Sequence, residues 1–226
     1  MMPSMCKKVV CFDLDDTLYK EVDYLKSGYR YIASRLNGAK PNATPDVIYN
    51  TLWTSYQNGE SDPFGCVIQK YGFNVYTKED LLNWYRYHKP DISLAEDIKK
   101  TLEALKKQGV EMGIISDGRK ITQLNKIEVL GLEPYMSAII INDNNKIIKP
   151  SEYSYRQIEK QFGKDCDYYY IGDNTGKDFI APNALGWTTV CLLNDGNNIH
   201  PQDFSLPETY LPKKTINNIG ELLSLI

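Results

Sequence analysis

The chain has 226 residues, enough for one large domain or for a core domain with a smaller insertion. Its 42% hydrophobic and 24% charged residues indicate a packed globular protein and argue against disorder. The net charge is −3, no block of Lys or Arg occurs, and no apolar run approaches the roughly 18 residues of a membrane span. We therefore expect neither nucleic acid nor a membrane as a partner. The five cysteines contain no CxxC pair and the N-terminus has no apolar signal core, so a cytoplasmic protein is expected.

The first predicted element is a strand over residues 7–12, a β-branched and aromatic run (KKVVCF) that ends at Asp13. The chain from residue 20 to residue 91 shows no convincing strand pattern. An apolar repeat of about 3.6 residues and the capping residues Thr44 and Thr77 predict helices there instead. The predicted helices cover about 20–36, 45–57 and 77–87, with a loop at 58–65. We therefore predict an all-helical domain, residues 20–91, inserted after the first strand.

Beyond residue 91 the chain alternates between helical and strand patterns. A helix is predicted over 94–108, with Ser93 and Glu96 as a capping box. Strands are predicted at 110–115, 137–141, 168–171 and 188–192, and further helices at 119–130, 151–162, 176–185 and 218–225. Strands separated by helices imply a parallel sheet wound right-handedly, with helices on both faces. The predicted fold class is α/β, with a doubly wound parallel sheet formed by residues 1–19 and 92–226.

Polar residues follow the predicted strands at four places, and the carboxyl ends of parallel strands share the sheet edge at which ligands bind. Asp13 and Asp15 leave the first strand on the same side, and two neighbouring carboxylates suit a nucleophile and a proton carrier. Ser116, followed by Asp117 and Gly118, suits phosphate oxygens at a helix start. Taken alone, the first group reads equally well as an acidic surface turn and the second better as a helix cap.

The other two groups are Lys149-Pro150 and Gly172-Asp173-Asn174. The Lys149 ammonium suits a transferring phosphoryl group, although a single Lys-Pro is usually a solvated loop. Asp173 and Asp178 supply the oxygen ligands that Mg²⁺ prefers, although the same residues suit a turn before a capped helix. The convergence of four groups on one edge favours a catalytic site over four unrelated turns.

In order and spacing, these groups resemble the motifs of the haloacid dehalogenase-like hydrolase superfamily. The matching segments are FDLDDTL at 12–18, IISDG at 114–118, Lys149-Pro150 and IGDNTGKD at 171–178. The resemblance implies a Rossmann-like core, and residues 20–91 lie where that superfamily inserts its helical type 1 cap. It further implies a Mg²⁺-dependent phosphatase that hydrolyses a small phosphate monoester, a sugar phosphate or nucleoside monophosphate, through an aspartyl phosphate.

Carried over to this chain, the resemblance makes Asp13 the nucleophile and Asp15 the general acid and base. It places Mg²⁺ on Asp13, Asp173 and the backbone carbonyl of Asp15. Ser116 and the Asp117 amide are then expected to hold the phosphoryl oxygens.

Lys149 completes the implied catalytic set by balancing charge around the phosphoryl group. Thr17, Asn174 and Asp178 are supporting positions, with Asp178 steadying either Lys149 or a metal-bound water. One departure concerns Asp117, because the superfamily frequently has Asn there. A carboxylate at this place repels phosphate unless it points away.

Several alternatives remain beside the phosphatase. Dehalogenases and phosphonatases of the superfamily lack an acid at the position of Asp15, but a phosphomutase has one. A phosphomutase is distinguished from a phosphatase by its product, which is an isomer of the substrate instead of free phosphate. A phospho-acceptor signalling domain similar to receiver domains is disfavoured by the insertion at 20–91. The aromatic residues of that insertion suit either a surface that stacks on a substrate or, as we prefer, a helical core. We expect a monomer or homodimer that acts on a small phosphorylated metabolite.

Overall fold

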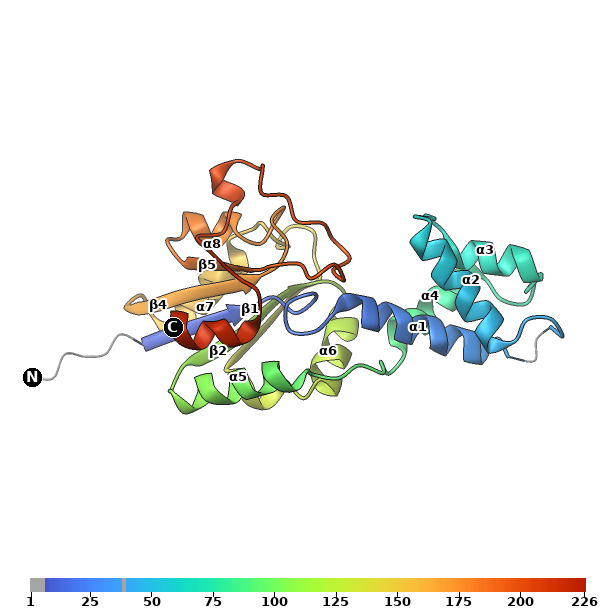
Figure 1. Ribbon diagram of the computed structural model, residues 1–226, viewed down its shortest axis with the longest axis horizontal. Helices are drawn as coiled ribbons and strands as arrows, with labels where there is room; N and C mark the ends of the chain where they lie inside the picture. The colour runs from blue at the N-terminus through green and yellow to red at the C-terminus, as the bar shows by residue number, and fades with distance from the viewer. Residues whose placement is uncertain (1–6, 38–39) are drawn as a thin grey trace, which may run out of the picture. The chain divides into compact units, whose positions relative to one another are not determined.

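A six-stranded parallel sheet organises the larger part of the computed structural model, which describes residues 7–37 and 40–226 (Figure 1). The strands are β1 (Lys7–Phe12), β2 (Glu111–Asp117), β3 (Ala138–Asn142), β4 (Cys166–Gly172), β5 (Thr188–Leu192) and β6 (Lys214–Ile216). Their order across the sheet is β3-β2-β1-β4-β5-β6, and every neighbouring pair is parallel. The predicted doubly wound α/β fold is therefore confirmed, with β1 between β2 and β4.

Helices cover both faces of this sheet. They are α5 (Glu96–Lys107), α6 (Lys120–Val129), α7 (Tyr153–Phe162), α8 (Ile180–Ala184) and α9 (Leu222–Leu225). The strand order reverses direction after β3, so right-handed crossovers put α5 and α6 on one face and α7 and α8 on the other (Figure 1). On the second face, Val9 and Cys11 of β1 are fully buried among residues that include Tyr155 of α7 and Ala181 of α8. The central strand is thereby enclosed, and its carboxyl end is held at the edge of the sheet.

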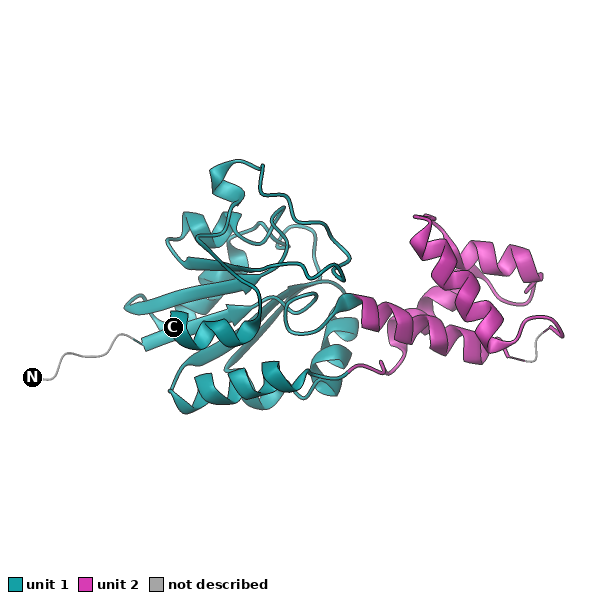
Figure 2. Cartoon of the chain, in the orientation of Figure 1, with its two compact units in different colours: residues 1–21, 93–226 teal, residues 22–92 magenta. Residues whose placement is uncertain are grey.

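Two compact units make up the chain (Figure 2). The sheet unit ends at Glu21 and resumes at Ser93, and the second unit is Val22–Ile92. The second unit is helical, with α1 (Glu21–Arg35), α2 (Pro45–Gln57), α3 (Pro63–Tyr71) and α4 (Lys78–Tyr87). Thr44 caps α2, and Thr77 with Asp80 forms a capping box at α4, as their sequence positions predicted. No helix within residues 7–37 and 40–226 is both long and apolar enough to cross a membrane.

The aromatic residues of the helical unit form its own core. Phe64 and Phe73 are buried together with Ile32, Leu36 and other aliphatic side chains. The half-buried aromatic residues packed against them are Tyr49, Trp53, Tyr56, Tyr71, Tyr76, Trp84 and Tyr85. This packing favours the helical-core interpretation of the aromatic residues over a stacking surface.

Some predicted elements were wrong. Residues 58–65 are only partly a loop, because Asp62 accepts a hydrogen bond from the Gly65 amide and caps α3 at Pro63. Ser93 and Glu96 form no capping box, since Ala95 precedes the first turn of α5 without a side-chain bond.

The end of the chain also differs from its prediction. Helix α8 starts later than predicted, at Ile180, because the preceding residues form a turn around the Asp178 carboxylate. The predicted helix over 218–225 is a 3₁₀ turn, Ile219–Glu221, followed by the short α9. The sequence analysis missed β6, which is only three residues long.

Candidate active site

The four groups of polar residues come together at the carboxyl edge of the sheet. Asp13 directly follows β1, and its amide donates a hydrogen bond of 2.8 Å to the carbonyl of Ile171 in β4. Ser116 and Asp117 end β2, Asp173 follows β4, and Lys149 lies between β3 and α7. A cavity of about 220 Å³ opens there, lined by Asp13, Asp15, Asp16, Glu21, Asp117, Asp173, Asn174, Lys177 and His200.

Lys149 is a buried cation at this edge. Its Nζ lies 2.8 Å from Asp13 Oδ1 and 2.8 Å from Asp178 Oδ1, and it donates a hydrogen bond of 2.9 Å to the Tyr170 hydroxyl. Burial disfavours the charge, but Asp13 and Asp178 outweigh burial and hold the pKa of Lys149 well above its usual value. Burial raises the pKa of Asp13 to about 6 although Lys149 lowers it, and the ion pair with Lys149 favours the ionised carboxylate. This carboxylate is therefore in the state that a nucleophile requires.

Asp13, Asp173 and Asp178 form a cluster whose carboxylate oxygens, one from each residue, lie within 4.8 Å of one another. The pKa of Asp173 is raised to about 8, first by burial and then by repulsion from Asp178 and Asp13. Asp178 is engaged on both oxygens, by Lys149 and by the amides of Asp173 and Asn174. Asp13 and Asp173 are therefore the carboxylates best placed for a cation, and hard oxygen donors of this kind fit Mg²⁺.

Asp15 is held by donors from α6 and from its own loop. Lys126 Nζ lies 2.7 Å from Oδ1, Gln123 Nε2 donates to Oδ2 at 2.8 Å, and the Tyr19 hydroxyl also donates to Oδ1. Burial alone would raise the pKa of Asp15, but the Lys126 ammonium and these hydrogen bonds outweigh it and lower the pKa. Asp15 is thus a carboxylate fixed on both oxygens.

The carboxylate of Asp117 is occupied by donors. It accepts hydrogen bonds from the Asn142 side chain at 3.0 Å and from the Lys149 amide at 3.2 Å, and Lys177 Nζ lies 3.7 Å away. Asn142 is itself fixed by a hydrogen bond of 2.6 Å from the Ser154 hydroxyl. The acid that the sequence analysis found unusual therefore orders the backbone that carries Lys149, and its charge is partly balanced by Lys177.

The remaining predicted residues lie around this set. Ser116 is buried and its hydroxyl accepts a hydrogen bond of 2.6 Å from Gln123. Thr17 is buried, and its hydroxyl has no hydrogen-bond partner among the residues that the structure describes. The Asn174 side chain accepts the Gly176 amide at 2.9 Å and shapes the turn after Asp173.

The structure also brings in residues that the sequence analysis did not select. The loop between β5 and β6 places His200 in the cavity lining and Asn198 beside Asp173, with Nδ2 donating to Oδ2 at 2.9 Å. Glu21 enters at the start of α1, and burial and the nearby Asp15 raise its pKa to about 7. No local motif marks these residues, because they meet the site only through the path of the folded chain.

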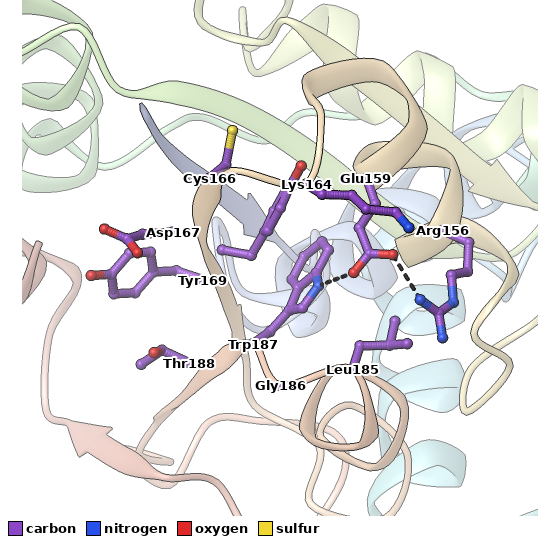
Figure 3. A pocket seen from close by; sticks show the side chains of 11 residues that line it. Arg156, Glu159, Lys164, Cys166, Asp167, Tyr169, Leu185, Gly186, Trp187 and Thr188 are labelled. Carbon is purple, nitrogen blue, oxygen red and sulfur yellow. Dashed lines mark hydrogen bonds and ion pairs between the residues drawn. The ribbon is translucent and has the colours of Figure 1, made fainter. Parts of the chain in front are cut away.

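A separate cavity of about 390 Å³ lies where β4 and β5 begin (Figure 3). Trp187 forms part of its wall and donates a hydrogen bond of 3.1 Å to Glu159, which also pairs with Arg156. Among the described residues, none lines both this cavity and the cavity at the carboxyl edge, which we call the acidic cavity. Because parallel sheets bind ligands at the carboxyl ends of their strands, the acidic cavity is the candidate active site.

Comparison with known proteins yields one family and several relatives. The family model for haloacid dehalogenase-like hydrolases matches residues 10–192. A glyceraldehyde 3-phosphate phosphatase of Methanocaldococcus jannaschii is 26% identical over 97% of this chain and 96% of its own. A protein of the same name from Pyrococcus furiosus is 28% identical over 81% of this chain and 79% of its own.

Solved structures share the fold. The HAD-hydrolase YfnB of Bacillus subtilis, bound to magnesium, superposes with a TM-score of 0.66 at 16% identity, covering 97% of this chain and 98% of its own. A 2-haloacid dehalogenase of Pseudomonas syringae superposes with a TM-score of 0.62 at 18% identity, covering 97% of both chains. At such identities the likeness concerns the fold alone.

Proposed function

The chain belongs to the haloacid dehalogenase-like hydrolase family, and from this membership we propose that it is a Mg²⁺-dependent phosphatase that acts through an aspartyl phosphate on Asp13. That it is a phosphoric monoester hydrolase agrees with relatives that carry phosphatase names. The observation that carries the proposal is the buried contact of 2.8 Å between Lys149 Nζ and Asp13 Oδ1. Asp13 also lies close to Asp173, and Asp15 follows it two positions later in the chain. This arrangement joins a nucleophile, a charge partner and a proton carrier at one edge.

In the first step, an Asp13 carboxylate oxygen attacks phosphorus and the bond to the leaving alkoxide breaks. Asp15, carrying the proton that it took from water in the preceding turnover, gives that proton to the alkoxide and becomes a carboxylate. In the second step, Asp15 takes a proton from water, the water oxygen attacks phosphorus, and the bond between Asp13 and phosphorus breaks. General acid–base catalysis of this kind contributes typically ~10²–10⁴-fold.

Charge neutralisation is the main requirement of phosphoryl transfer. Lys149 supplies one fixed positive charge, and Ser116 with the Asp117 amide lies at the end of β2, where phosphoryl oxygens are to be held. Asp13, Asp173 and the carbonyl of Asp15 would hold Mg²⁺, which supplies further positive charge to the phosphoryl group when it is bound. The pKa of Asp173 is raised first by burial and then by repulsion from Asp178 and Asp13, and this supports the assignment because a bound cation compensates both effects.

The substrate that we propose is a small sugar phosphate. Support comes from the relatives, named glyceraldehyde 3-phosphate phosphatase and, in Halopiger xanaduensis, ribulose-1,5-bisphosphate 5-phosphatase. A nucleoside monophosphate is less favoured, since many of the aromatic residues suited to stacking on a base pack in the helical core instead. We further propose that the helical unit, Val22–Ile92, is the cap that selects the substrate.

The test is a phosphate-release screen over phosphorylated metabolites, run with Mg²⁺ and with EDTA. We expect free phosphate from a sugar phosphate in Mg²⁺, none in EDTA, and background turnover for Asp13→Asn. The matched control is Asp143→Asn, an exposed acid in the loop after β3, which should behave as wild type. Intact-protein mass during turnover should show a phosphoryl adduct that accumulates in Asp15→Asn. Full turnover in EDTA, an isomer as the product, or wild-type activity of Asp13→Asn would refute the proposal.

A further inference from the structure

We propose that Lys126 and Gln123, two side chains of α6, are positioning residues that aim the Asp15 carboxylate for proton transfer. The inference rests on the proposed phosphatase function and adds to it a part of the site that lies outside the four motifs. Helix α6 thus has a role in the reaction beyond covering one face of the sheet.

The geometry gives each oxygen of Asp15 its own donor from the same helix. Lys126 Nζ is 2.7 Å from Oδ1, and Gln123 Nε2 is 2.8 Å from Oδ2. The two residues are three positions apart, so their side chains lie on one face of α6. The Tyr19 hydroxyl adds a further bond to Oδ1 from the loop itself. A carboxylate held at both oxygens by one helix has little freedom to rotate.

Burial makes this arrangement costly to maintain. Lys126 is 3% exposed and Gln123 is 2% exposed, whereas lysine is almost never fully buried unless it is paired. Taking an ammonium out of water is unfavourable unless an opposite charge and hydrogen bonds compensate. Here the compensating carboxylate is the proposed proton carrier.

Gln123 also connects Asp15 to the phosphate end of the site. Its Nε2 donates to Ser116 Oγ at 2.6 Å as well as to Asp15 Oδ2, and the Asp117 carbonyl oxygen is a longer third acceptor at 3.4 Å. An amide nitrogen carries two hydrogens, enough for the two short bonds. One buried side chain therefore sets the spacing between the proton carrier and the hydroxyl expected to hold phosphoryl oxygens. Misplacing a catalytic group by about 1 Å can cost ~10²-fold in rate, so this spacing matters for turnover.

The experiment compares two kinds of leaving group in single-turnover measurements. The alkoxide of a sugar phosphate needs a proton to leave, whereas nitrophenolate leaves an aryl phosphate without one. Lys126→Met keeps roughly the length of the side chain and removes the ammonium, and Gln123→Leu removes the hydrogen bonds to Asp15, Ser116 and the Asp117 carbonyl without changing charge. We expect each variant to lose about 10²-fold in the first step on the sugar phosphate, because the lost alignment of Asp15 outweighs the easier protonation that follows when the Lys126 ammonium is removed. For Lys126→Met the initial burst of nitrophenolate should stay within about threefold of wild type. For Gln123→Leu the burst should fall by a smaller factor than the rate on the sugar phosphate, because the hydrogen bond to Ser116 is lost as well.

Controls separate this role from a structural one. Lys120→Met, on the exposed first turn of the same helix, should leave both rates unchanged. Circular dichroism and urea unfolding show whether each variant is folded. If Lys126→Met does not fold, Gln123→Leu, which changes no charge, provides the test. Folded variants that lose both first-step rates by the same factor, or lose neither, overturn the inference.

The outcome is also distinguishable from failure of the proposed function. A wild-type protein that releases phosphate from no monoester refutes the phosphatase. The other outcome is an active wild-type protein and an inactive Asp13→Asn, with α6 variants whose preference between the two leaving groups is unchanged. That outcome refutes only the role of Lys126 and Gln123.

Discussion

The ionisation of Asp173 should make the metal-free protein less stable as the pH rises. Burial, Asp178 and Asp13 raise the pKa of this carboxyl to about 8 from its usual 3.8. Between these two pKa values the folded protein keeps a proton that the unfolded chain has released. The stability is therefore fully present below the pKa of the unfolded chain, and it is lost as the pH rises to the pKa of the folded protein. Four pH units correspond to a ceiling of roughly 6 kcal/mol, and water entering the cavity lowers it. We expect the free energy of unfolding to fall by about 2–4 kcal/mol over this pH range.

The perturbation is Asp173→Asn, which keeps the shape of the side chain and removes its ionisation. Urea unfolding in EDTA should give similar stabilities for wild type and variant below about pH 4, and a variant more stable by about 2–4 kcal/mol near pH 9. Asp143→Asn, in the exposed loop after β3, should follow wild type throughout. Adding Mg²⁺ should stabilise wild type and not the variant, because only wild type retains both carboxylates. A difference between wild type and Asp173→Asn that does not change with pH would refute the reasoning.

Two further substitutions test the buried contacts. Lys149→Met leaves Asp13 and Asp178 without their cation, so urea unfolding near pH 8 should show a free energy of unfolding lower by about 3–5 kcal/mol. Adding Asp178→Asn should restore part of this loss. An unchanged stability of Lys149→Met would contradict the ion-pair account. Gly28→Ala would place a methyl carbon 2.4 Å from the Tyr85 ring, so tryptophan-monitored unfolding should show a loss of about 1–3 kcal/mol, against little change for the exposed Ser34→Ala. Equal stabilities of these two variants would show that the ring moves aside freely.

Local patterns were sufficient for much of the fold. The bounds of β1 and β5 match the predicted strands, because β-branched and aromatic runs between turn residues are a local signal. The caps at Thr44 and Thr77 are equally local, since each side chain bonds an amide three residues on. Asp62-Pro63 carries the same kind of signal, and α3 could have been predicted from it.

The order of residues along the chain also places polar residues after the ends of several strands, and the parallel topology then brings those ends to one edge. What the sequence could not determine is the environment of each side chain. Lys126 lies 111 residues from Asp15, and a lysine on a surface helix is expected to be solvated. Only the packing of α6 against the sheet, where it contacts β3, buries Lys126 against that carboxylate. Asn198 and His200 likewise reach the site through a long loop, because burial and partner choice depend on contacts between distant segments and not on neighbours in the chain.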